Sequence, residues 1–240
     1  MDSERWCIHI DMEGFGALYG QEDQILWSFC ELMRAIYRIG TRVYPEPPDR
    51  LFVHQTGDGF AILSDFHEPL PLRAVAIAVV LMRHVASTGR YARAAISEGD
   101  HADIVGCYPR EVTDSRDPGD DTAILGHGLM TLFPVMGTAL IRAVGVAKRS
   151  PPGPLLLLDR RFETRLPPEF LAKKTNERPD AALSVDWIHR DVPLAEEIWS
   201  QLDFSTVSNN KIEEDLISYC KQYDPRGWTP SLQQFLALDL

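Results

Sequence analysis

The stretch from Leu72 to Ser87 limits the possible folds more than any other part of this sequence. Its centre, Ala74 to Met82, is continuously apolar and is flanked by Arg73 and Arg83. This apolar run is too short to cross a bilayer, which takes about 20 residues as a helix. A helix that is apolar around most of its circumference has to be buried on several sides. We therefore expect this segment to be a helix packed against a sheet, in a chain of 240 residues that is long enough to bury a substantial core.

The segments on either side of this helix alternate between strand and helix patterns. A strand is expected at Arg5 to Asp11, a helix at Glu22 to Ile39, a hairpin at Leu51 to Ser64 and a strand at Ala92 to Ser97. The resulting order is β-α-β-β-α-β. It predicts an α+β fold of the ferredoxin-like split βαβ type, with an antiparallel sheet and helices on one of its faces.

The second half of the chain is expected to add helices and two more strands. The polar region from His101 to Asp121 is typical of a long loop. The remaining predicted elements are a helix at Leu125 to Ala147 interrupted at Pro134, strands ending at Asp159 and His189, and helices at Pro193 to Leu202, Asn209 to Tyr223 and Pro230 to Leu238. We expect residues 1–190 to form one catalytic domain and residues 191–240 a helical extension that packs on this domain or on a dimer.

Charge and cysteine content exclude several classes of function. The formal net charge of −11 disfavours nucleic acid or an anionic membrane as the main partner. The four cysteines are scattered and form no C-x-x-C pair, so neither a zinc site nor a disulfide framework is expected. The first residues lack a basic region followed by an apolar one, which argues against a secretory signal. These features predict a reduced, cytoplasmic protein.

Two acidic residues stand at corresponding places in the predicted sheet. Asp11 ends the first strand, and Asp58 lies in the turn of the hairpin. In a split βαβ sheet these strands are neighbours, so both carboxylates are expected at one end of the sheet. Adjacent carboxylates repel each other unless cations lie between them. Magnesium takes one or two carboxylates together with phosphate oxygens. The pair therefore predicts a site for a nucleoside triphosphate with two divalent ions, Mg²⁺ or Mn²⁺.

The residues beside the two acids support this interpretation. Gly14, Phe15 and Gly16 lead into a helix, where free backbone N–H groups can hold phosphate. The carbonyl of Met12 is a further candidate metal ligand, and Gly57 precedes Asp58 in the turn. Each acid alone also has a structural interpretation, since Asp-Gly is a common hairpin turn and Asp11 could cap a helix.

These motifs resemble those of the class III nucleotidyl cyclases. The family's first strand ends in F-x-D-[IVM]-x-G-F, which IHIDMEGF resembles through Asp11, Gly14 and Phe15, and its hairpin carries the G-D found here at Gly57 and Asp58. The resemblance covers about Arg5 to His189. It implies that a ribose 3′-hydroxyl attacks the α-phosphorus of a nucleoside triphosphate, which gives a 3′,5′-cyclic monophosphate and pyrophosphate. It also implies a head-to-tail homodimer with the active sites at its interface.

The residues at the family's base-reading positions differ from those of adenylate and guanylate cyclases. His54 replaces their Lys or Glu, and Pro134 replaces their Asp or Cys. The chain is more similar to the bacterial uridylate and cytidylate cyclases of Pycsar anti-phage systems, whose G-x-A-x-x-x-A pattern is present at Gly137, Ala139 and Ala143. This resemblance implies UTP as substrate, cyclic UMP as product and a role in anti-phage signalling. Cytidylate and adenylate cyclases are the alternatives, and His54 could instead be a strand residue satisfied by a neighbour.

The resemblance fails at the family's transition-state Asn and Arg, whose places are taken by Ile141 and Gly145. Arg142 is our candidate catalytic replacement, with Arg149 as a second nearby cation. The basic residues before the last strand are open candidates for phosphate binding: Lys173, Lys174 and Arg178. A non-catalytic, nucleotide-binding regulatory domain is the main alternative function. A diguanylate-cyclase relative is a third, although its G-G-D-E-F turn is missing.

Overall fold

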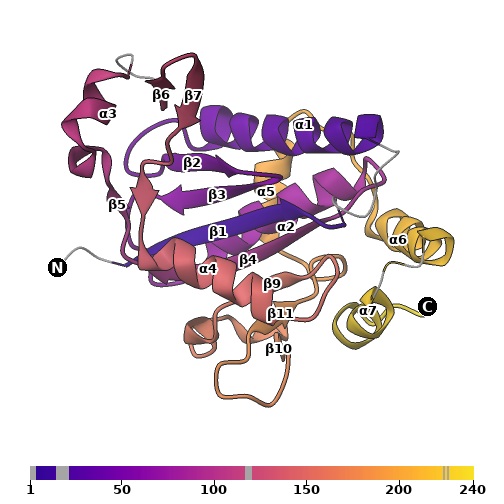
Figure 1. The fold of residues 1–240 in the computed structure, drawn as a ribbon. Coiled ribbons are helices and arrows are strands. Elements are labelled where there is room, and N and C mark those ends of the chain that lie inside the picture. The colour runs from indigo at the N-terminus through magenta and orange to yellow at the C-terminus, as the bar shows by residue number, and fades with distance from the viewer. Residues whose placement is uncertain (1–3, 15–21, 117–120, 224, 226) are drawn as a thin grey trace.

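A computed structural model describes residues 4–14, 22–116, 121–223, 225 and 227–240 of the chain. Within these ranges it contains seven α-helices and a mostly antiparallel sheet of seven strands, a mixed α/β architecture (Figure 1). Two short two-stranded sheets lie beside it. None of the helices in the described ranges combines the length and the apolar character needed to cross a membrane.

The long strand β1 (Arg5–Met12) runs through the middle of the large sheet. It pairs antiparallel with β3 (Gly59–Ser64) on one side and with β4 (Ala92–Gly99) on the other. The hairpin partner of β3, β2 (Leu51–Thr56), forms one edge of the sheet. The other half of the sheet contains β9 (Leu156–Leu158), which is parallel to β4, followed by β11 (Leu183–Val185) and β10 (Lys173–Lys174). The predicted succession of strands and helices is therefore present from Arg5 to Gly99.

One face of the sheet carries the main hydrophobic core. The helices α1 (Glu22–Arg38) and α2 (Leu72–Ala86) cover this face, and the apolar run of α2 is buried as predicted. The last three helices contribute residues to the same core: α5 (Pro193–Ser200), α6 (Asn209–Tyr223) and α7 (Trp228–Leu236). The C-terminal segment thus packs on the body of the protein, while the predicted domain boundary at residue 190 stays a prediction.

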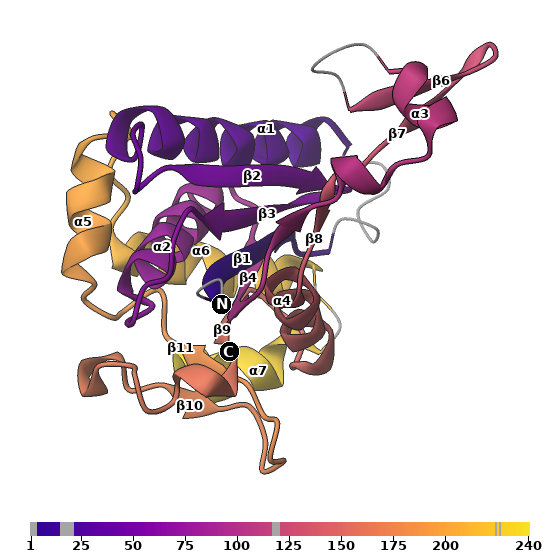
Figure 2. The same ribbon diagram turned by 90° about the vertical axis from the view of Figure 1, so that its left-hand side faces the viewer.

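The opposite face of the sheet is covered in part by α4 (Thr138–Arg149), as Figures 1 and 2 show. The prediction that all helices lie on one face is therefore wrong. Ala139 and Ala143 of α4 pack against Cys7, Ala61 and Leu63 of the sheet. These small side chains let the helix come close to the strands, which explains the G-x-A-x-x-x-A pattern in packing terms. At the start of α4, a Cβ on Gly137 would lie 2.1 Å from the carbonyl oxygen of Asp100.

The region before α4 also differs from its prediction. A helix was expected from Leu125, but a hairpin of β6 (Thr122–Leu125) and β7 (Gly128–Thr131) occupies this region, and the helix begins only at Thr138. Gly126 has a φ of +62°, a conformation that suits a tight turn and interrupts a helix. The hairpin and α3 (Arg110–Asp114) project from the body of the protein as an arm (Figure 2). The arm is tied to the body by β8 (Val135–Met136), which pairs with β5 (Ala102–Asp103).

Candidate functional site

A groove lies on the second face of the sheet, beside α4. Its volume is about 510 Å³, within the range of small-molecule sites. The strand register places three of its lining residues, Thr56, Asp11 and Arg93, in one row across the sheet, and His9 lines it from the next row. The helix α4 contributes Leu140, Val144, Ala147 and Lys148 to the lining. Ala61, which pairs with His9, is fully buried beneath Ala139 and Ala143 of α4 and does not line the groove.

The structure brings Asp11 and Asp58 to the same end of the sheet. Asp11 pairs with Gly59, the neighbour of Asp58, and the N–H of Met12 donates a hydrogen bond to the carbonyl oxygen of Asp58 at 3.3 Å. This close approach depends on the glycine, because a Cβ on Gly59 would lie 2.4 Å from the carbonyl oxygen of Ile10. The glycine after Asp58 therefore serves the approach of β1 as well as the hairpin turn.

Asp11 lies in a desolvated and crowded electrostatic environment. Burial raises the pKa of its carboxyl to about 6, against the lowering effect of Arg93, and the charge of Asp58 raises it further. Burial also raises the pKa of Glu13, whose main opposing influence is Arg93, its ion-pair partner at 3.2 Å. A cation at this place would favour the ionised form of these carboxylates.

Several polar atoms in the groove are buried and have no hydrogen-bond partner among the residues that the structure describes. They are Asp11 Oδ1, His9 Nδ1, Thr56 Oγ1 and Arg93 Nε, and all four residues line the groove. Buried polar atoms are nearly always paired in folded proteins, so four orphans in one groove indicate a ligand. The described residues contain no group of three or more His, Cys, Asp and Glu side chains suited to hold a metal. A magnesium ion that takes most of its ligands from phosphates and water does not need such a group, and Asp11 Oδ1 fits it.

The other residues predicted to bind the nucleotide or metal lie around these acids. Gly14 and Gly57 have φ values of +76° and +67°, which favour glycine. The backbone of Met12 lies beside the hairpin turn, because its N–H donates a hydrogen bond to the carbonyl oxygen of Asp58. The side chain of Met12 is buried in the main core. Phe15 and Gly16 lie outside the residues that the structure describes.

His54 lies two residues before Thr56 on β2, in the same row as His9. Its ring is perpendicular to that of Phe133 at 5.4 Å between centroids, so the segment that contains Pro134 does lie close to it. Burial lowers the pKa of His54, although the carboxylates of Asp121 and Asp103 oppose this effect. Pro134 contributes its carbonyl oxygen to a bond from the Ile104 N–H at 2.7 Å.

The structure does not bring Arg142 to the two acids of the same chain. Its guanidinium donates to the carbonyl oxygen of Glu98 at 2.8 Å, at the other end of β4. Glu98 pairs with Trp6, five residues before Asp11 on β1, a separation of about 16 Å. Within one chain Arg142 and the two acids therefore lie far apart along the sheet, and its catalytic role stays a prediction.

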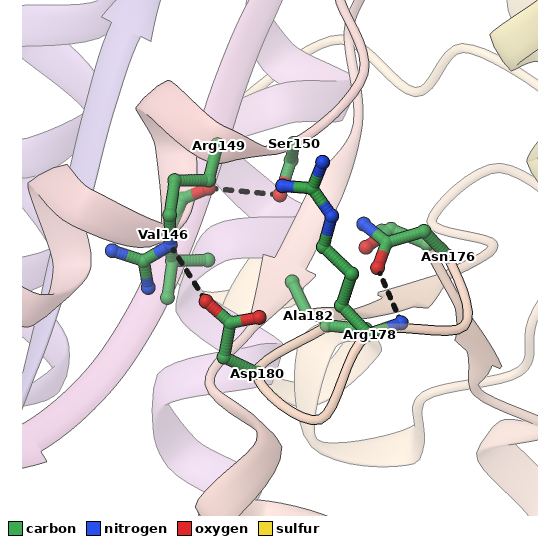
Figure 3. A pocket seen from close by; sticks show the side chains of 9 residues that line it. Val146, Arg149, Ser150, Asn176, Arg178, Asp180 and Ala182 are labelled. Carbon is green, nitrogen blue, oxygen red and sulfur yellow. Dashed lines mark hydrogen bonds and ion pairs between the residues drawn. The ribbon is translucent and has the colours of Figure 1, made fainter.

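The other predicted cations are also engaged elsewhere. Lys173 donates to the carbonyl oxygen of Gln234, and Lys174 pairs with Glu163. Arg149 pairs with Asp180 at 3.7 Å beside a small pocket, into which Arg178 extends toward Ser150 (Figure 3). This pocket has a volume of about 20 Å³, enough for a single water molecule, and it shares no lining residue with the groove.

Sequence reasoning missed the five other polar residues that line the groove: His9, Glu13, Thr56, Arg93 and Lys148. The strand period of two contained a signal for His9, because it lies on the same face as Asp11. Arg93 and Lys148 depended on strand pairing and on the position of α4. Among the described residues Lys148 has no ion-pair partner, and it is the exposed cation of the groove.

Comparisons with known proteins give one distant structural match of interest. No family model matches the chain, and neither does any curated protein. Among 17 matching chains of solved structures is a bacterial light-regulated adenylyl cyclase, with 9% sequence identity and a TM-score of 0.48. The match covers 84% of this chain and 58% of that chain. With a TM-score below 0.5, it assigns neither an activity nor a substrate here.

Proposed function

We propose that this chain is a nucleotidyl cyclase with a split βαβ cyclase core, which converts UTP to cyclic UMP and pyrophosphate. The observation that carries the proposal is the convergence of Asp11 and Asp58 at one end of a nucleotide-sized groove, where Asp11 Oδ1 is buried and has no partner in the described part of the chain. The motif resemblance to class III cyclases gives the reaction. A signalling role in anti-phage defence rests on the resemblance to Pycsar cyclases alone.

The proposed reaction is an internal displacement at the α-phosphorus. The 3′-oxygen forms a bond to this phosphorus, and the bond to the oxygen bridging the α- and β-phosphates breaks. Pyrophosphate leaves with the electron pair, and the hydroxyl proton passes to water. Mg²⁺ or Mn²⁺ would supply acidification of the hydroxyl and neutralisation of phosphate charge.

The protein's own residues would hold and orient the reactants. Asp11, Asp58 and the carbonyl of Met12 are the ligands proposed for the metal ions. Lys148 is placed at the last turn of α4, where it can face the phosphates as their charge increases. Arg93 is anchored by its ion pair with Glu13 and fixes the charge beside Asp11.

The preference for a pyrimidine is supported by His54. Its neutral imidazole offers one donor and one acceptor, and it cannot reproduce the charge of a lysine or a glutamate. Pro134 offers no polar side-chain group, so the groups that select purines in the resembling cyclases are absent.

A homodimer is part of the proposal, because the arm carries exposed apolar side chains. Ile124, Leu125 and Leu129 of the β6–β7 hairpin are 56%, 57% and 73% exposed. Large apolar side chains gathered on a projecting hairpin are typical of an interaction surface. We expect Leu129→Asp to convert a dimer to a monomer in light-scattering measurements, with the secondary structure unchanged. A wild-type monomer under assay conditions would contradict the dimer.

One observation favours a second candidate function, a nucleotide-binding regulatory domain without catalysis. Ile141 and Gly145 occupy the positions of the transition-state residues, and Ile141 is 65% exposed and apolar. Such a domain would bind a nucleoside triphosphate with metal and release it unchanged.

The decisive test is turnover of the purified protein with UTP, CTP, ATP and GTP, each with Mn²⁺ and with Mg²⁺. We expect cyclic UMP and pyrophosphate from UTP, and no cyclic product from the Asp58→Asn variant. Asp239→Asn is the matched control, because it makes the same chemical change on an exposed C-terminal residue. Nucleotide binding without any cyclic product would favour the regulatory domain, and full activity of Asp58→Asn would exclude the metal assignment.

A further inference from the structure

Thr56 is a polar residue of the groove that the proposed mechanism does not use. It is the last residue of β2, beside the turn that carries Asp58, and it lines the groove together with Asp11. Its Oγ1 is buried and has no hydrogen-bond partner among the residues that the structure describes. A hydroxyl in this state still has one hydrogen bond to donate and lone pairs that can accept others.

The strand register places Thr56 and Asp11 on either side of one glycine. Both pair with Gly59, one from β2 and one from β1, so the three residues lie in one row on the same face of the sheet. A Cβ on Gly59 would lie 2.9 Å from the Cβ of Asp11, which shows that the side chain of Asp11 takes the space over the glycine. No side chain of β3 in this row therefore stands between Thr56 and Asp11.

The two unpaired oxygens of this row complement each other chemically but do not bond to each other. Thr56 Oγ1 and Asp11 Oδ1 are both buried in residues that line the groove, and neither has a partner in the described ranges. An ionised carboxylate accepts hydrogen bonds and attracts cations, whereas a hydroxyl can donate. A group that satisfies both oxygens presents a cation to the carboxylate and an acceptor oxygen to the hydroxyl. A phosphate bound to a divalent metal ion has this character.

A second threonine shows what distinguishes Thr56 from an ordinary unpaired hydroxyl. Thr175 Oγ1 is also buried and has no partner in the part of the chain that the structure describes. It lines the small pocket of about 20 Å³, which admits one water molecule. The groove that Thr56 lines has a volume of about 510 Å³, so it has room for a ligand that Thr175 does not meet.

The position of Thr56 indicates which part of a nucleotide its hydroxyl would meet. It is level with Asp11 across the sheet and two residues from Asp58 along the hairpin. The Cα atoms of Thr56 and Asp11 are about 9–10 Å apart across two strand spacings. The two side chains can bridge this span with two metal–oxygen bonds of about 2.1 Å and one hydrogen bond of about 2.7 Å. The part of the nucleotide that lies at the metal ions is its triphosphate.

We infer that Thr56 is a phosphate-binding residue, whose hydroxyl donates a hydrogen bond to an oxygen of the metal-bound triphosphate. This inference rests on the proposed nucleotide site and adds a contact that does not depend on the base. Thr56 does not coordinate the metal, and it takes no part in the bond-making step.

The test compares variants that differ in the hydroxyl. Thr56→Val keeps the branched shape without the hydroxyl, whereas Thr56→Ser keeps the hydroxyl. Thr175→Val is the matched control, because it removes a buried threonine hydroxyl that likewise has no partner in the described ranges and lies outside the groove. Affinities are measured calorimetrically for Mn²⁺ alone, for inorganic tripolyphosphate with Mn²⁺, and for the four 3′-deoxynucleoside triphosphates with Mn²⁺, which cannot cyclise.

The expected result is a loss of phosphate affinity without a loss of stability. Thr56→Val should weaken tripolyphosphate and all four nucleotides by the same factor, about 10-fold, because a hydrogen bond to a charged group is lost. Mn²⁺ alone should bind as it does to wild type, and Thr56→Ser and Thr175→Val should bind all ligands as wild type does. Without ligand, Thr56→Val should resist urea at least as well as wild type, since it removes a buried polar atom that has no partner in the described residues.

The outcomes separate this inference from the proposed function. Unchanged tripolyphosphate binding in Thr56→Val would overturn the role of Thr56, and so would an equal loss of Mn²⁺ alone or a loss confined to one base. If wild-type protein binds the nucleotides and forms no cyclic product, cyclisation is excluded while the affinities decide the inference. Wild-type protein that binds neither tripolyphosphate nor nucleotides would overturn both. If Thr56→Val does not fold, Thr56→Ala replaces it, because it differs from Thr56→Ser only in the hydroxyl.

Discussion

The two faces of β1 are made by alternate residues of one short strand, and they differ in almost every physical property. Trp6, Ile8, Ile10 and Met12 are at most 4% exposed and belong to the main core with α1 and α2. Cys7, His9 and Asp11 face the other way, where only Cys7 is packed by α4. The period of two along a strand thus gives one face to stability and the other to the site.

The difference between the two faces of β1 explains how the protein can tolerate unpaired polar atoms in the groove. A buried polar atom without a partner costs about 1–3 kcal/mol. Counting only partners that the structure describes, the groove holds four such atoms. The apolar face of the same strand offsets this cost, because each buried large aliphatic side chain contributes about 1.5–3 kcal/mol. We therefore expect substitutions on the two faces to have opposite effects: loss of stability on one, and loss of function with retained stability on the other.

The largest expected effect is on the function of the site face. Asp11→Asn removes a carboxylate that we propose as a metal ligand while keeping the side-chain shape, and metal ions supply several kcal/mol to reactions of this type. We expect the rate of cyclisation to fall by about 1,000-fold or more. The measurement is kcat with UTP and Mn²⁺, with Asp239→Asn as control. A loss of less than about threefold would remove Asp11 from the metal site.

The matching change on the core face is Ile8→Ala, which affects stability and leaves the site intact. Ile8 is fully buried among the core residues. Truncation of such a side chain costs about 2–5 kcal/mol. We expect urea unfolding to show this loss, while the KM of the folded fraction stays unchanged. A destabilisation below 1 kcal/mol would mean that the two faces do not differ as described.

The pH dependence of stability should reveal the buried carboxyl of Asp11. Its folded pKa of about 6 lies above the ordinary value of 3.8 for an aspartate. The unfolded chain therefore loses this proton at lower pH, and the folded state is progressively destabilised as pH rises from about 4 to about 6. The shift corresponds to about 2–3 kcal/mol without metal. Asp11→Asn should be more stable than wild type at pH 7.5 in EDTA by this order, and equally stable near pH 4. Equal stability of the two proteins at both pH values would contradict this environment.

The sequence predicted the core face better than the site face for a physical reason. The apolar run of α2 and the alternation in β1 are local patterns, and local patterns identify buried surfaces directly. The place of Asp58 followed from its hairpin turn, which is also local. Strand pairing places Arg93 beside Asp11, and the packing of α4 places Lys148 in the same groove. Neither of these contacts between distant segments is visible in a linear pattern. The hairpin at 122–131 was interpreted as helix because its apolar residues are exposed on an arm and do not alternate against a core.

The smallest expected effect separates two cations of α4 that lie near opposite ends of the groove face. Lys148 lines the groove, whereas Arg142 is held by the carbonyl oxygen of Glu98 about 16 Å along the sheet from Asp11. We expect Lys148→Ala to reduce kcat/KM about 10-fold and Arg142→Ala to reduce it by less than about threefold, since only the first removes a charge that faces the phosphates. Steady-state kinetics with UTP measures both, and circular dichroism controls for folding. An equal loss in the two variants would mean that Arg142 acts in the site of the partner subunit. Mixed dimers of Arg142→Ala and Asp58→Asn chains would show this directly. In such a dimer one of the two sites would carry both substitutions and the other neither, so about half of the wild-type activity would return.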